Sequence, residues 1–174
     1  MFGFKRKDHA TEFVQGPGGQ QVLRSIAVFI GHFKVLDGWN TEMISIPEVA
    51  YLAAFNAWVT IRTNLRHFLL TSREAAEVGA GLVQALSQWY GELQQLTRAE
   101  IEVLEKRGFD RLLEYDEMWM AGIKEKDQGA YLLHIYTCVQ KNHDPALSAG
   151  FLDHFVSFCD TEQRLAMELK AVGR

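Results

Sequence analysis

The sequence predicts an all-α protein, a single-domain antiparallel bundle of six or seven helices. Apolar residues return every three or four positions along most of the chain, and a helix-capping pattern precedes three of these stretches. No run of alternating polar and apolar residues lies between turn signals, so no strand is expected. The 174 residues suffice to bury one full core. We expect a flexible N-terminal leader at residues 1–19, ending in a Gly-Pro-Gly-Gly stretch, and one helical domain at residues 20–174.

The first expected helix covers residues 20–36, where the apolar residues form one stripe. The second begins after Ser45 and extends to about residue 70. Its start combines the Ser45 hydroxyl, a proline at position 47 and the Glu48 carboxylate, which is the pattern of a capping box. Because this helix is apolar nearly all round, we expect it to be the central element of the bundle.

Capping boxes also precede the next two helices. Thr71 with Glu74 opens a helix that reaches about residue 96, and Gly79 and Gly81 near its start leave room for close approach of another backbone segment. Its apolar residues step by four and three like a coiled-coil seam: Val78, Leu82, Leu86, Trp89, Leu93 and Leu96.

Thr97 with Glu100 opens the fourth helix. Lys106 and Arg107 followed by Gly108 look like the cationic last turn and the C-terminal cap of a helix, so we expect a break there and a further helix at residues 109–123. Two more helices are expected at residues 128–140 and, after the Asp144-Pro145 cap, at residues 145–172.

The charge and the apolar content of the chain limit the kinds of molecule that we expect it to bind. The net charge of −4, with 18 basic residues scattered among 22 acidic ones, argues against nucleic acid. No apolar run is long enough to span a bilayer and no signal peptide is recognisable, so we expect a soluble cytoplasmic protein whose two cysteines are free thiols. The aromatic and basic residues at positions 2–7 allow at most weak peripheral contact with a membrane.

Histidine and cysteine gather in the last third of the chain: His134, Cys138, His143, His154 and Cys159. The first two are four residues apart and share a helix face, a spacing that can hold zinc. The set lacks the tight two-residue spacings of zinc modules, so we expect no metal and no cofactor. Glu114, Asp116 and Glu117 are the carboxylates that a magnesium-dependent nucleotide hydrolase would use, but a solvated helix face explains them more simply.

The leading functional hypothesis is therefore a non-enzymatic interaction or regulatory module, of the adaptor, immunity or chaperone-like kind, that binds another protein or a second copy of itself. The residues predicted to anchor a partner are Trp39, Tyr115, Trp119 and Met120. The alternative is a bundle that encloses a small apolar ligand or cofactor, lined by aromatic residues: Phe55, Trp58, Phe109, Tyr131, Tyr136, Phe151 and Phe155. A metal-dependent nucleotide hydrolase is the third possibility.

Overall fold

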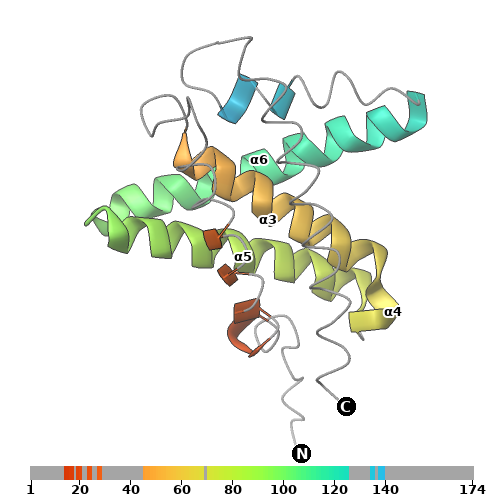
Figure 1. The fold of residues 1–174 in the computed structure, drawn as a ribbon, viewed down its shortest axis with the longest axis horizontal. Coiled ribbons are helices and arrows are strands. Elements are labelled where there is room, and N and C mark those ends of the chain that lie inside the picture. The colour runs from red at the N-terminus through yellow and green to blue at the C-terminus, as the bar shows by residue number, and fades with distance from the viewer. Residues whose placement is uncertain are drawn as a thin grey trace, which may run out of the picture.

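The computed structural model describes residues 14–17, 19–20, 23–24, 27–28, 45–68, 70–125, 134–135 and 137–139. These residues contain no strand, which confirms the all-α prediction for this part of the chain. Three long helices and one short helix are defined here: α3 (Ile46–Thr63), α4 (Leu65–Phe68), α5 (Ser72–Leu93) and α6 (Arg98–Glu125) (Figure 1).

The predicted count of six or seven helices is not confirmed, because only these four helices are defined. The helices expected at residues 20–36, 128–140 and 145–172 lie largely or wholly outside the described residues, as do residues 2–7. Within the described part, no helix combines the length and the apolar character that crossing a membrane requires.

Helix α3 is the central element, as its all-round apolar sequence predicts. It packs against both α5 and α6, which also pack against each other (Figure 1). Twelve of its 18 residues are buried, among them Leu52, Phe55 and Ile61. Removing this apolar surface from water is the main force that holds the three long helices together.

The start of α3 is where the sequence places it, but the predicted capping box is absent. Ser45 is the N-cap residue, yet its side chain makes no capping hydrogen bond. The Glu48 side chain is buried and turned toward α6 instead. The end of the helix also differs, since α3 stops at Thr63 rather than near residue 70. The Asn64 side chain donates a 2.8 Å hydrogen bond to the Thr60 carbonyl, a local contact that competes with further helical turns.

Helix α5 begins with the predicted capping box. The Glu74 amide donates to the Thr71 hydroxyl at 3.2 Å, and the Thr71 amide donates to the Glu74 carboxylate at 2.8 Å. The N-terminal half of its seam is buried, whereas Trp89 and Leu93 in the second half are exposed. Gly79 lies against the Trp58 ring, where a Cβ atom would come within 2.8 Å of ring atom Cδ1. The close approach expected at this glycine is therefore a contact with a side chain.

A short turn joins α5 to α6 and is held by local hydrogen bonds. The Leu96 amide donates to the Gly91 carbonyl at 2.8 Å, and Gln95 takes a positive φ of 55°. The third predicted capping box follows directly, because the Thr97 amide donates to the Glu100 carboxylate at 2.8 Å.

The predicted break at Gly108 is wrong, because α6 continues without interruption from Arg98 to Glu125. Gly108 is buried where α6 crosses the other two long helices. A Cβ atom there would lie 2.5 Å from Val83 Cγ1 and 2.8 Å from Tyr51 Cε1. The glycine lets α6 approach both neighbours closely, and this packing outweighs the intrinsic cost of glycine in a helix.

Few residues of the expected leader are described. Val14 is one of them, and it belongs to the buried core, where it lies against Gly81 of α5. The boundary between leader and domain at residue 19 stays a prediction.

Candidate functional site

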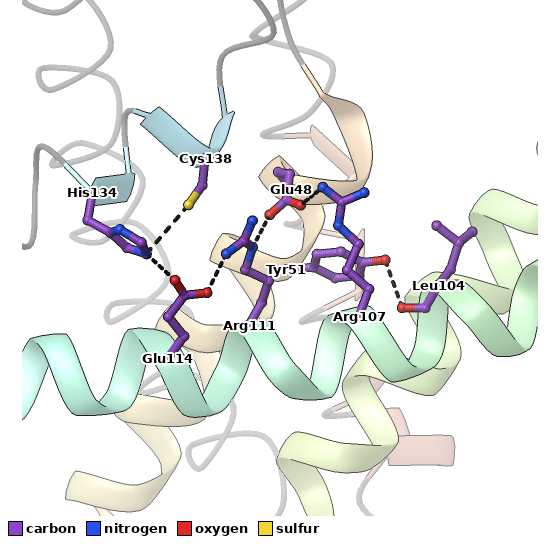
Figure 2. A network of polar contacts seen from close by, with 8 residues as sticks. All are labelled: Glu48, Tyr51, Leu104, Arg107, Arg111, Glu114, His134 and Cys138. Carbon is purple, nitrogen blue, oxygen red and sulfur yellow. Dashed lines mark hydrogen bonds and ion pairs between the residues drawn. The ribbon is translucent and has the colours of Figure 1, made fainter.

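A buried carboxylate lies at the centre of the described part of the molecule. Glu48, in the first turn of α3, has a side chain that is 0% exposed. The Arg111 Nε atom donates a hydrogen bond to its Oε2 atom at 2.8 Å, and an Arg107 guanidinium nitrogen lies 2.5 Å from its Oε1 atom (Figure 2). A carboxylate buried without partners would be very unfavourable. These two cations from α6 compensate its charge and connect α3 to α6.

The contacts continue from Arg111 to the segment at residues 134–139. Arg111 also donates to Glu114, whose Oε1 atom lies 2.8 Å from His134 Nε2 (Figure 2). Burial disfavours the Arg111 charge, but the hydrogen bonds to Glu48 and Glu114 outweigh this effect and raise its pKa. The Ser45 amide donates to the Val139 carbonyl at 2.8 Å, so this segment is also attached to the start of α3.

The Cys138 thiol lies close to His134 and Glu114 but does not form a nucleophilic triad with them. Its Sγ atom is 3.5 Å from His134 Nε2, the same ring nitrogen that contacts Glu114. A triad needs opposite ring nitrogens, one to accept the nucleophile's proton and one to bind the carboxylate. In addition, burial raises the pKa of Cys138, which opposes formation of the reactive thiolate.

The three carboxylates considered for magnesium do not converge on one site. Glu114 is paired with Arg111, and Asp116 lies 2.6 Å from an Arg62 guanidinium nitrogen. Glu117 is exposed. Among the residues that the structure describes, no group of three potential metal ligands could hold an ion. His143, His154 and Cys159 lie outside those residues.

The described aromatic residues of the predicted ligand pocket are core residues. Phe55 packs against Trp58 and Tyr115, with ring centroids 6.1 Å and 5.6 Å apart, and Phe109 packs against the same cluster. Their neighbour Tyr115 is 0% exposed. Its ring fills the contact between α6 and α3, so the predicted partner-binding residue Tyr115 is not at the surface here. The remaining predicted aromatic residues lie outside the described part: Trp39, Tyr131, Tyr136, Phe151 and Phe155.

Two cavities instead lie along the side of α5 that faces residues 14–28. One of about 610 Å³ is lined by Val14, Leu23 and Gly81 among others, and a second of about 450 Å³ is bounded by Leu86 and Trp89. Of the predicted pocket residues that the structure describes, Phe55, Trp58 and Phe109, none lines either cavity.

A row of exposed side chains runs along the side of α6 that faces away from α3 and α5. We call it the outward stripe. Its members follow one another at alternating spacings of four and three, and all are exposed: Ala99, Val103, Lys106, Asp110, Leu113, Glu117, Met120 and Lys124. Among them, Val103 is 67%, Leu113 63% and Met120 53% exposed. The buried residues of α6, such as Leu112 and Tyr115, lie on the opposite side of the helix.

Sequence reasoning found only part of these sites. Met120 was predicted as a partner-binding residue and lies in the outward stripe, whereas Trp119 is half-buried and packs against the core. The stripe residues alternate at spacings of four and three, which could have been found in the sequence. Four of the eight positions are charged, however, so these residues do not form an apolar pattern. No pattern of neighbouring residues indicated the pairing of Glu48 with Arg107 and Arg111.

Comparison of the chain with protein-family models, with curated proteins and with solved structures finds no match.

Proposed function

We propose that this chain is a non-enzymatic helical interaction module that binds a protein partner through the outward stripe of α6. The observation that carries the proposal is the exposure of three large apolar side chains, Val103, Leu113 and Met120, along one side of one helix. Exposed apolar residues in a row are typical of protein-binding surfaces. The three side chains are ten and seven residues apart, and helices that present apolar residues along one side are a recurrent form of such a surface.

The opposite side of α6 supports this proposal because it holds the helix rigidly. Ile101, Leu112 and Tyr115 are buried in the contacts with the other helices, and Arg107 and Arg111 are fixed on Glu48. A surface that is already ordered before binding loses little conformational entropy when a partner arrives. The stripe is thus a preorganised surface.

The polar network favours a structural role over a catalytic one. Catalysis needs convergent polar groups that are available to a substrate. Here Glu48 has two arginine partners, and Glu114 contacts both Arg111 and His134. These contacts compensate the charges inside the protein and join α3, α6 and residues 134–139.

We also infer that the chain continues the same architecture beyond the described residues. The three-and-four periodicity at residues 20–36, 128–140 and 145–172 supports a total of six or seven helices in one domain. Far-ultraviolet dichroism of the full chain should then give more helix than α3 to α6 supply. A helix content no greater than that of these four helices would contradict the larger count.

Site-specific photo-crosslinking in cells tests the binding surface. A photoreactive amino acid replaces Leu113 in the full chain, and the matched control carries it at Leu93, which is 56% exposed but belongs to α5 and not to the stripe. We expect a discrete adduct from position 113 and none from position 93. Equal adducts from both positions, or none from position 113, would contradict the proposal. Dichroism of both variants checks that the fold is retained.

A further inference from the structure

We propose that the partner is a second copy of this chain, paired antiparallel along the outward stripe of α6. This inference rests on the proposed function and adds the identity of the partner and the register of the pairing. Three features carry it, namely the spacing of the stripe, the arrangement of its charges and its position on the outer side of the bundle.

The spacing fits a coiled-coil contact. Alternating steps of four and three residues repeat every seven, so one side of α6 offers the two core positions of a heptad over its whole length. The helix has 28 residues and is therefore about 40 Å long. Toward its C-terminal end it diverges from α3 (Figure 1), and the stripe residues are exposed from Ala99 to Lys124.

The charges select an antiparallel register centred between Asp110 and Leu113. In this register Lys106 faces Glu117 of the partner subunit, and Val103 faces Met120 of the partner subunit. Ala99 faces Lys124 of the partner subunit, whose aliphatic stem can cover it while the ammonium group stays in water. Because a two-fold axis makes every contact occur twice, the pairing gains two ion pairs and two apolar contacts, while Asp110 faces Leu113 of the partner subunit on either side of the axis.

Other arrangements of the same stripe are less favourable. A parallel pair in register would place each charged residue against its own copy, so that Lys106, Asp110, Glu117 and Lys124 would all meet like charges. An antiparallel pair shifted by one heptad in one direction brings Lys106 against Lys124. A shift in the other direction pairs Lys106 with Asp110 and Val103 with Leu113, but it shortens the overlap and leaves Met120 outside it. The central register alone overlaps the whole stripe and pairs its two large apolar ends.

Charge exchange tests the pairing and its register. Native mass and sedimentation velocity should give twice the monomer mass of 19.8 kDa for the natural chain. Lys106→Glu and Glu117→Lys each place like charges against one another twice, and we expect each to weaken dimerisation at least about tenfold. Mixing the two variants should restore a dimer, because each new charge then faces an opposite one. The chain that carries both substitutions should dimerise like the natural chain.

Lys124→Glu is the matched control. It changes the net charge by the same amount on the same stripe, but it faces Ala99, so its effect should be clearly smaller than that of Lys106→Glu. All three positions are exposed, and dichroism should be unchanged in every variant. If Glu117→Lys dimerises like the natural chain, the register is wrong.

The crosslinking and mass measurements separate this inference from the proposed function. A monomer at all concentrations, together with a Leu113 adduct that contains a different protein, would overturn self-pairing and keep the stripe as a binding surface. A monomer without any Leu113 adduct would overturn both.

Discussion

Glu48 and Arg111 are 63 residues apart in the chain, yet the Arg111 Nε atom donates a 2.8 Å hydrogen bond to the Glu48 Oε2 atom. This contact fixes the first turn of α3 against the middle of α6. Arg107 reaches the second carboxylate oxygen from one helical turn away. A residue whose sequence context is that of a helix cap thus connects two helices.

Replacing Glu48 with glutamine should destabilise the protein strongly. The substitution keeps the shape of the side chain but removes the charge that compensates Arg107 and Arg111. We expect the free energy of unfolding to fall by about 2 to 4 kcal/mol, less than for a fully buried pair, because Arg107 is half exposed and can be hydrated. Urea denaturation measures the change.

Glu77→Gln is the control for this experiment. Glu77 pairs with Arg73 on the exposed side of α5 at 3.0 Å, and such pairs contribute at most about 1 kcal/mol. An equal loss of stability in the two variants would mean that burial does not strengthen the contribution of Glu48.

Substitution of Gly108 by alanine distinguishes the continuous α6 from a helix broken at this position. At an ordinary helix interior the change would stabilise by about 1 kcal/mol. Here the new methyl group would overlap Val83 and Tyr51, so we expect a loss of about 1 to 3 kcal/mol in thermal or chemical unfolding. A stabilised variant would show that α6 does not pack closely at Gly108.

The three Ser/Thr-x-x-Glu patterns should respond differently to removal of the hydroxyl. Thr71→Ala and Thr97→Ala each remove a cap that the structure contains, and each should cost about 1 kcal/mol of unfolding free energy. Ser45→Ala removes a hydroxyl that makes no cap hydrogen bond, so its cost should be close to zero. Equal costs at all three positions would contradict the different roles of these hydroxyl groups.

Stability should fall at alkaline pH as Tyr51 loses its proton. Burial, aided by the negative charge of Glu48, raises the pKa of Tyr51 from 10.0 to about 12. Because the folded pKa is the higher one, this stabilising contribution is complete below pH 10 and is lost as the pH rises toward about 12. Burial raises the pKa of Tyr115 as well, so both residues act in the same direction.

Unfolding measurements across this pH range should therefore show a decline, with tyrosinate absorbance appearing as the protein unfolds. Tyr51→Phe should make the decline less steep. The same variant should lose about 1 kcal/mol at neutral pH, because the Tyr51 hydroxyl donates a 2.8 Å hydrogen bond to the Leu104 carbonyl. A decline of unchanged steepness would assign the alkaline transition to other groups.

The sequence predicts correctly those features that depend on residues close to one another in the chain. The capping boxes at Thr71 and Thr97 involve residues three positions apart, and the structure confirms both. The central position of α3 follows from its apolar composition alone. The Ser45 pattern has the same spacing but fails, because a distant pair of arginines binds the glutamate more strongly than the local amide does.

Gly108 and the polar network depend on contacts between distant parts of the chain. Whether a glycine ends a helix or admits a neighbour depends on what packs against it, and neither Val83 nor Tyr51 is near it in sequence. The four-residue spacing of His134 and Cys138 places them near each other, but Glu114 joins them only once α6 lies against this segment. No local pattern contains this information.

The long separation between Glu48 and its two cations also constrains the order of events on the ribosome. Helix α3 is synthesised well before Arg107 and Arg111 leave the exit tunnel, so its apolar sides and its carboxylate meet water or a chaperone first. The α5–α6 hairpin, stabilised by its own caps and turn, can assemble as soon as it emerges. The contact between α3 and α6 then forms when this hairpin closes over a helix that was made earlier.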